Sequence, residues 1–248
     1  MTPAIIIMTV VTVWLLWRHV WFFRNPKRTP AETGRVVLSP ADGKVIYIRC
    51  VAKGAVPVSV KRRRSIALQE LVGSAAKKPA GDMLVVGIFM SPFDVHYQRA
   101  PIAGRVDGVW YTRGTNLPMT ATWMRSALGL RPYERGASHL FTNERNTVLF
   151  SGERGVDGRT EPELGCVKAR SKRSEGVLRV WVVQIADLYV RRIVCKVHPG
   201  VRVRAGESYG LIRMGSQVDV VMPARMVKKM LVAEGDRVRA GETVLATY

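Results

Sequence analysis

Short valine-rich runs constrain the fold of this chain more than any other feature of its sequence. Most are four to eight residues long and are bounded by Gly, Pro or Asp, residues that favour turns. The runs are "RVVLSP", "GKVIYI", "MLVVGIFM", "GRVDGVWY", "NTVLFSG", "VLRVWVVQIA" and "RRIVCKV". Helical periodicity is confined to "SIALQELVGSAA" and, more weakly, to "MTATWMRSALG". The pattern predicts a mainly β protein of the α+β class with short helices.

An internal repeat refines this prediction. The segments "HPGVRVRAGESYGLI" (198–212) and "AEGDRVRAGETVLAT" (233–247) share G-x-x-V-R-A-G-E, displaced by the 35 residues between Gly200 and Gly235. Each copy has the pattern turn, strand, Gly turn, strand, which predicts two half-units that pack face to face into a flattened barrel. The pattern resembles the biotinyl and lipoyl carrier domains, in which a hairpin joins the halves and carries a prosthetic group on a lysine. The resemblance implies a barrel-sandwich core.

The carrier lysine would fall 16 residues after Gly200, and that position is Ser216. Biotin and lipoate are therefore excluded. Ser216 lies between two apolar runs in "GLIRMGSQVDVVMP" (210–223), which predicts a hairpin with Gly215 and Ser216 in its turn. Gly and Ser are common turn residues, so the pair alone indicates no function. A prosthetic group at this turn would have to be made from the two residues themselves.

Gly215 and Ser216 can make such a group. A serine hydroxyl can attack the preceding carbonyl and convert the amide into an ester. β-Elimination of the ester breaks the chain and leaves dehydroalanine, which hydrolyses to a pyruvoyl group on the new N-terminus. Glycine at the preceding position admits the nucleophile and tolerates unusual φ and ψ. The reaction needs a base for the hydroxyl and a donor for the oxyanion, and the resulting ketone is an electron sink.

The charge of the chain indicates an anionic partner. Lys and Arg number 39 against 19 Asp and Glu, a formal net charge of +20 at pH 7. Such a charge suits nucleic acid, an anionic membrane or an acidic substrate. No recognition-helix, RNP-type or zinc-finger pattern accompanies it, which argues against nucleic acid. The three cysteines have no CxxC spacing and are expected to be reduced, without a disulfide framework or a metal site.

The N-terminus favours the membrane among these partners. "AIIIMTVVTVWLLW" is an unbroken apolar run, and basic residues follow it instead of preceding it. No small-residue cleavage site appears, so a cleaved signal is not expected. The run is short of the roughly 20 residues of a span, but a snorkelling Arg18 can extend it to Phe23. We expect an uncleaved anchor that spans the membrane or lies in its interface, with the rest of the chain on the cytoplasmic face of the cell membrane.

Six segments in order along almost the whole chain carry a family resemblance. They are "FFRNPKR" (22–28), "SPADGKV" (39–45), "FMSPFDVHYQRAP" (89–101), "NERN" (143–146), "VVQIADLYVRRIV" (182–194) and "RMGSQVDVVMP" (213–223). On these segments the chain resembles the phosphatidylserine decarboxylase proenzymes of the short, membrane-associated type, which depend on a pyruvoyl group. The resemblance implies self-cleavage between Gly215 and Ser216.

The domain boundaries follow from these features. We expect an anchor at 1–24, a Pro-rich linker at 25–34 and a catalytic domain at 35–248. The resemblance implies that cleavage divides the chain into a β chain, 1–215, and an associated α chain of 33 residues, 216–248. Homo-oligomerisation stays open.

The resemblance also assigns the site residues. Ser216 becomes the pyruvoyl group, Asp42 of "SPADGKV" orients and supports a base, and His96 of "SPFDVHYQRAP" transfers protons. On the residues alone, Asp42 is equally the Asp of an Asp-Gly turn, and His96 a satisfied core residue. Asp94, in the same loop as His96, is expected to cap a turn.

Longer members of the family carry a second histidine three residues after the first, where this chain has Arg99. Arginine cannot act as a base. Either His96 performs both functions, or another group activates Ser216, and His139 is then the substitute. Arg99, Arg145 and His139 are candidate substrate-binding residues; for the arginines the alternative is a buried structural ion pair.

The implied reaction is the decarboxylation of phosphatidylserine in an anionic membrane to phosphatidylethanolamine, with a covalent pyruvoyl group and no metal. The alternative that the repeat alone would permit is a membrane-tethered carrier or adaptor without enzymatic activity. The carrier predicts an intact chain of 27.6 kDa, whereas the enzyme predicts two fragments divided before Ser216.

Overall fold

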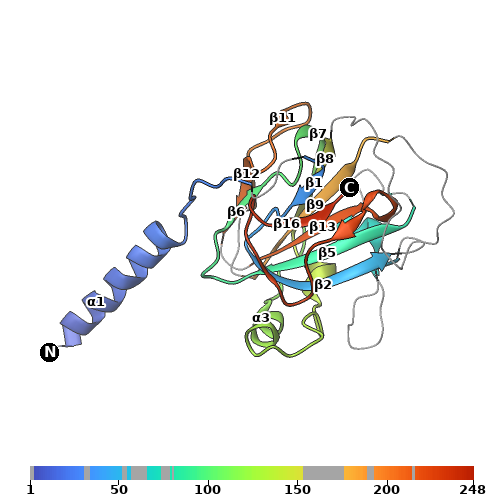
Figure 1. The fold of residues 1–248 in the computed structure, drawn as a ribbon. Coiled ribbons are helices and arrows are strands. Elements are labelled where there is room, and N and C mark those ends of the chain that lie inside the picture. Colours follow the sequence, from blue (N-terminus) through green and yellow to red (C-terminus); the bar gives the residue numbers. More distant parts are fainter. Residues whose placement is uncertain are drawn as a thin grey trace.

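The computed structural model describes residues 3–30, 34–51, 55–56, 66–73, 79, 81–152, 176–188, 193–213 and 216–248. Over these residues the protein is mainly β, with a curled antiparallel sheet that forms a half-barrel and with short helices around it (Figure 1). An apolar helix projects from the body at the N-terminus. The prediction of a mainly β chain with short helices and an N-terminal apolar helix is confirmed.

The curled sheet, called the main sheet below, has eight strands within the described part of the chain. Every neighbouring pair is antiparallel. The strand order is β11 (Arg202–Val203), β7 (Gly104–Thr112), β8 (Arg145–Gly152), β9 (Arg179–Ala186), β13 (Ser216–Pro223), β5 (Met83–Met90), β2 (Gly43–Val51) and β15 (Arg237–Val238). Strand β13 is therefore central and is paired on both sides.

This strand order is symmetric about the contact between β9 and β13, where Val182 faces Val220. Each copy of the sequence repeat supplies one edge strand: β11 pairs with β7 at Gly104, and β15 pairs with β2 at Gly43. Both glycines have a φ of +151°, and an added Cβ would lie 2.0 Å (Gly104) or 2.2 Å (Gly43) from a backbone oxygen of the next strand. Only glycine fits at such a close approach. The repeat thus marks two equivalent halves of the main sheet.

Two smaller sheets lie beside the main sheet, each with three strands among the described residues. Their orders are β10 (Ile193–Cys195), β12 (Ser208–Ile212), β6 (Tyr97–Arg99), and β1 (Val36–Leu38), β16 (Val244–Thr247), β14 (Lys229–Met230). A short pair joins β3 (Ala55–Val56) to β4 (Ile66–Ala67).

The hairpin predicted around Gly215 is wrong. Strand β12 ends at Ile212 and β13 begins at Ser216, but the two strands belong to different sheets. Both edges of β13 are already paired with β5 and β9, so β12 pairs with β6 and β10 instead. The chain therefore passes from one sheet to another immediately before Ser216. Met214 and Gly215 lie outside the described residues.

The longest helix is α1 (Pro3–Leu16), which continues through one π-helical turn, η1 (Trp17–Trp21). Of the described helices, this continuous segment is the one long and apolar enough to cross a membrane, and none of it is buried. The other helices are α2 (Leu68–Val72), α3 (Thr120–Ala127), α4 (His139–Thr142) and the 3₁₀ turn η2 (Ala224–Met226). The weaker helical candidate in the sequence thus forms the longer helix. Helix α2 ends at Gly73, which has a φ of +91°.

Both faces of the main sheet are buried. Along β5, Leu84, Ile88 and Met90 belong to one hydrophobic cluster, and the alternate residues Val85 and Phe89 belong to a second. The smaller sheets contribute to the first cluster, whereas α2 and α4 contribute to the second. Because consecutive side chains of a strand point to opposite faces, neighbouring residues of β13 enter different environments.

The predicted linker is fastened to the body. Arg99 Nη2 donates hydrogen bonds to Asn25 Oδ1 and to the Pro26 carbonyl, both 2.8 Å. Arg28 forms a bidentate ion pair with Asp42. Residues 25–30 are therefore held in place, and 31–33 lie outside the described residues.

Candidate active site

Ser216 is fully buried at the first position of β13. Its backbone is in register with Met90 of β5 and with Ala186 of β9. Its hydroxyl donates a hydrogen bond to the Met90 thioether, with 3.3 Å between Oγ and Sδ. A thioether is a weak acceptor, so the hydroxyl can turn to a better acceptor at little cost.

A row of buried amides approaches Ser216 on the same face of the main sheet. Asn146 Nδ2 donates to Gln184 Oε1 (2.8 Å), and Gln184 Nε2 donates to Gln98 Oε1 (2.9 Å). Gln98 Nε2 in turn reaches Met90 Sδ at 3.6 Å, so Gln98 and Ser216 share one weak acceptor. We did not predict this row. Its signal in the sequence is a glutamine inside the apolar run "VVQIA".

His96 is fully buried in the loop before β6. Its Nδ1 lies 2.8 Å from the Asp94 carbonyl oxygen, which can only accept, so Nδ1 carries the proton. Nε2 is then an acceptor, and it has no hydrogen-bond partner among the described residues. Burial lowers the pKa of His96 to about 4, although the Asp94 carbonyl opposes the shift. The ring is thus neutral at pH 7 and has an open lone pair.

The backbone ties His96 to the segment that precedes Ser216. The Ile212 N–H donates to the His96 carbonyl at 3.2 Å, four residues before Ser216. No hydrogen bond joins Ser216 to His96 among the described residues, because the serine hydroxyl binds Met90. The two candidate catalytic residues are therefore at the same end of the fold, without a direct bond between them.

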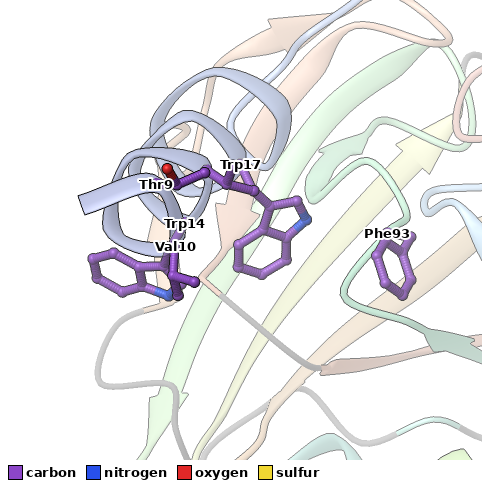
Figure 2. Close-up of a pocket in the computed structure, with 6 residues that line it drawn as sticks. Thr9, Val10, Trp14, Trp17 and Phe93 are labelled. Carbon is purple, nitrogen blue, oxygen red and sulfur yellow. The ribbon is translucent and has the colours of Figure 1, made fainter. Parts of the chain in front are cut away.

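The end of the anchor covers His96. The buried Phe22 ring packs against the imidazole, with 4.1 Å between ring centroids. An apolar groove of about 450 Å³ lies beside it, between α1–η1 and the loop that leads to His96. In Figure 2, Trp17 and Phe93 face each other across this groove. The end of the apolar N-terminal helix and the candidate site are therefore in contact.

Asp42 does not bond to His96. Its carboxylate accepts both Arg28 bonds and also the backbone N–H of Ala240, at 2.7 Å, in the second repeat copy. Asp94 is the turn cap that was expected: its Oδ2 accepts from the backbone N–H and the hydroxyl of Ser91, at 2.8 and 2.7 Å. Its Oδ1 accepts from Arg237 Nη2 at 2.6 Å.

The opposite face of β13 holds a second buried polar cluster, which begins with the residue after Ser216. Gln217 Nε2 donates to Asp219 Oδ1 (2.7 Å) and to the Tyr47 hydroxyl (3.0 Å), and that hydroxyl donates to Asp219 Oδ2 (2.8 Å). His139 Nε2 lies 2.9 Å from Gln217 Oε1, to which it donates. The structure thus places His139 across the sheet from the Ser216 side chain. "GSQVDVV" contains the signal, an aspartate inside a valine strand.

Burial shifts the pKa values in this second cluster. It raises the pKa of Asp219 to about 6 despite the hydrogen bonds from Gln217 and Tyr47. Burial also lowers the pKa of His139 to about 4, with a further lowering by the nearby Arg145 charge. Both shifts favour the neutral form.

Arg99 and Arg145 both hold main-chain carbonyls. Arg99 binds the linker and donates to the Gly206 carbonyl at 3.0 Å. Arg145 donates to the Glu70 carbonyl in α2 (2.7 Å) and to the Asn143 carbonyl (3.2 Å). Among the described residues both arginines thus have carbonyl partners, and not the carboxylates of the alternative ion-pair interpretation. Substrate binding by either arginine stays a prediction.

Comparison with known proteins identifies the family. The family model of phosphatidylserine decarboxylase matches residues 15–246. The chain is similar to the phosphatidylserine decarboxylase proenzyme of Saccharopolyspora erythraea, with 35% identity over 96% of this chain and 74% of the relative. The proenzymes of Geotalea daltonii (33% identity, 95% of this chain, 80% of the relative) and Azorhizobium caulinodans (36%, 92% and 72%) are also similar. The chain belongs to the phosphatidylserine decarboxylase family.

Proposed function

We propose that this chain is a proenzyme that cuts itself between Gly215 and Ser216 and then decarboxylates phosphatidylserine to phosphatidylethanolamine. Family membership supports the reaction and its substrate, and the proenzyme names of the relatives support processing. The structural observation that carries the proposal is Ser216 itself. It is a fully buried serine with a weakly bound hydroxyl, at the same end of the fold as a histidine with an open lone pair.

The residues around Ser216 fit a pyruvoyl group. Such a group has a ketone oxygen, which is an acceptor, where the serine had its backbone N–H, and a methyl group where it had the hydroxyl. Among the described residues, the Gln98 Nε2 donor is bound to the Met90 thioether, a weak acceptor, so it can turn to a stronger acceptor at little cost. When present, the pyruvoyl ketone would withdraw electrons from the substrate.

His96 is the proposed proton carrier. During processing its Nε2 accepts the hydroxyl proton of Ser216 and passes it to the backbone nitrogen that the hydroxyl displaces. During turnover the same atom takes up the proton that the substrate ammonium loses and delivers it to the α carbon from which carbon dioxide has left. The Asp94 carbonyl supports this role because it fixes the proton on Nδ1 and leaves Nε2 open. Arg99 is not required for proton transfer, since its guanidinium holds the linker.

Asp42 is the proposed positioning residue, and it acts through Arg28. Their ion pair holds the linker against the second repeat copy, where Ala240 also bonds to the carboxylate. A fixed linker keeps Phe22 over His96, and Phe22 excludes water from the imidazole. Without this cover, the imidazole would be more hydrated and more easily protonated.

The strand pairing supports the expected association of the two chains after cleavage. The proposed α chain, 216–248, begins with β13, which pairs with β5 from Ser216 to Pro223 and also with β9. It also supplies β15 and β16, which pair with β2 and β1. Cleavage breaks one peptide bond and leaves all of these strand pairings intact.

We further propose the anchor, linker and catalytic domain at 1–24, 25–34 and 35–248, with the catalytic domain on the cytoplasmic face. The 19-residue apolar segment Pro3–Trp21 and the basic residues after it support this orientation. The symmetric main sheet, with one repeat copy at each edge, supports a barrel-sandwich relationship for the body.

Mass spectrometry under denaturing conditions tests processing. The wild-type protein should give two fragments divided before Ser216, and Ser216→Ala should give one chain of 27.6 kDa. Ser208→Ala is the matched control, because it removes the same group from a serine whose hydroxyl has no hydrogen-bond partner among the described residues. An intact wild-type chain, or a cut in Ser216→Ala, would overturn the proposal.

A further inference from the structure

Helix α3 has its amphipathic pattern reversed. Its buried side chains are the polar Thr122 and Ser126, which lie four residues apart on one face. Large apolar side chains point outward instead, both on the helix and just after it. We call these residues the α3 patch: Trp123 (45% exposed), Met124 (54%), Leu128 (67%) and Leu130 (49%).

This arrangement is unfavourable for a helix that faces water alone. A surface helix normally turns its apolar stripe to the core and its polar face to solvent. Here Thr122 Oγ1 is buried without a hydrogen-bond partner among the described residues, while an indole, a thioether and leucines are exposed. Contiguous exposed apolar side chains mark an interaction site. The α3 patch is therefore a candidate surface for a partner outside the chain's own core.

The charges around the α3 patch identify the kind of partner. Arg113, Arg131 and Arg135 are exposed at its borders. Glu134 is the sole acidic residue in the sequence from 111 to 137, and it is buried and ion-paired with Arg49. Exposed arginines thus outnumber acidic side chains in the segment that carries the patch, although Glu234 and Asp236 lie near Arg131. A tryptophan and leucines inside a rim of arginines fit the interface of an anionic bilayer.

The position of α3 places the patch on the side of the membrane helix. Lys44 Nζ donates to the Ser126 carbonyl at 2.8 Å, and Lys44 is in register with Arg237. Arg237 pairs with Asp94, the neighbour of Phe93, which faces Trp17 across the groove of Figure 2. In Figure 1, α1 runs to the lower left, α3 protrudes from the lower end of the body, and β11 lies at the opposite end.

We propose that the α3 patch is a second membrane-docking surface, which lies in the interface of the anionic bilayer that holds α1. Docking goes beyond the proposed function and does not depend on catalysis. It would nevertheless serve catalysis, because Asp187 Oδ1 accepts from the Met119 N–H at 3.0 Å at the start of α3. Asp187 directly follows Ala186, the register partner of Ser216. Docking of α3 would thus seat the Ser216 end of the main sheet on the membrane.

Quenching of Trp123 by brominated lipids tests the proposal on the full chain. Trp14, Trp17 and Trp21 are replaced by phenylalanine, so that the anchor stays apolar but emits no tryptophan fluorescence. The emission of Trp123 is then the difference between this background protein and the same protein with Trp123→Phe. In vesicles of phosphatidylglycerol and phosphatidylcholine, we expect bromination to reduce this emission about twofold, since interfacial helices bury their apolar face roughly 5–10 Å deep.

Two pairs of variants separate lipid contact from other causes. Arg131→Gln with Arg135→Gln should weaken the quenching, whereas Arg105→Gln with Arg204→Gln, near β11 at the opposite end, should leave it unchanged. Leu128→Ile should preserve the quenching and Leu128→Ser should reduce it, because a bilayer requires apolarity and not a particular shape.

Unquenched Trp123 emission in anionic vesicles would overturn the proposal, even for a fully active enzyme. So would a homodimer that Leu128→Ser dissociates without a change in quenching, because the patch would then bind a second copy. If Trp123 emission is quenched but the protein is uncleaved and inactive, the result would support the docking surface and contradict only the proposed function.

Discussion

Replacement of His96 by phenylalanine tests whether this residue serves chemistry or stability. The substitution keeps an aromatic ring against Phe22 and removes both ring nitrogens. One nitrogen donates to the Asp94 carbonyl at 2.8 Å, and the other is buried without a partner among the described residues. The variant therefore removes one favourable contact and one unfavourable one.

The two contributions to stability nearly cancel. Loss of the hydrogen bond to Asp94 costs about 1 kcal/mol, and removal of a buried unpaired acceptor recovers about 1–3 kcal/mol. The net gain is about 0–2 kcal/mol, so we expect His96→Phe to melt between about the wild-type temperature and about 8 °C above it, since 1 kcal/mol shifts the melting temperature of a chain of this size by roughly 2–4 °C. Loss of the proton carrier should slow processing or decarboxylation by about 10²–10⁴-fold.

The assay compares the wild type, His96→Phe and a control variant. It measures thermal unfolding, the processed fraction on a denaturing gel and carbon dioxide release from phosphatidylserine labelled in its carboxylate. His198→Phe is the control, because His198 is exposed and its ring bonds only to the Pro199 carbonyl among the described residues. A His96→Phe protein that processes and turns over normally would refute the role of His96. A large drop in its melting temperature would show that His96 is needed for folding.

Three further predictions concern charge and stability. Acidification from pH 7 should destabilise the protein, because burial lowers the pKa values of His96 and His139 to about 4 in the folded state. The stability that these neutral rings contribute above their unfolded pKa is lost as the pH falls through the folded pKa, by roughly 3 kcal/mol for each histidine. A melting temperature that rises on acidification would contradict this. Asp219→Asn should raise the melting temperature more at about pH 8 than at about pH 5. Burial raises the pKa of Asp219 to about 6, so its ionised form is disfavoured by roughly 3 kcal/mol at pH 8, and about half of this penalty remains at pH 5. Equal effects at both pH values would be the contrary result. Arg28→Gln and Asp42→Asn should each reduce stability and the processed fraction, because loss of one partner of a buried ion pair costs about 3–5 kcal/mol. The double variant should be no worse than either single variant. Additive losses in this double-mutant cycle would show that Asp42 acts without Arg28.

Sequence patterns predicted the elements of this fold better than their pairing. Valine-rich runs between Gly and Pro indicate strands, because turn chemistry is local. The pairing of β12 with β6 and not with β13 depends on which strand edges are already occupied, and no local pattern contains that information. The repeat was more informative, since Gly43 and Gly104 occupy equivalent positions beside its two copies.

The candidate site was predictable in part, because motifs marked Ser216, His96 and Asp42 but not their contacts. The sequence offers His139 as a base for Ser216, but helix α4 packs on the other face of the main sheet, so the His139 ring bonds to Gln217. The side of the sheet on which a distant helix packs is a tertiary property. Arg28 could not be recognised as the partner of Asp42 for the same reason.

Analysis of the small fragment tests the central claim most directly. The account predicts that the purified protein, denatured and separated, contains a chain of residues 216–248 that resists Edman degradation and is lighter by one ammonia than the same peptide with an N-terminal serine. Treatment with an amine and cyanoborohydride should add that amine to this chain alone. A fragment with a free N-terminal serine, or one that shows no such carbonyl, would contradict the account.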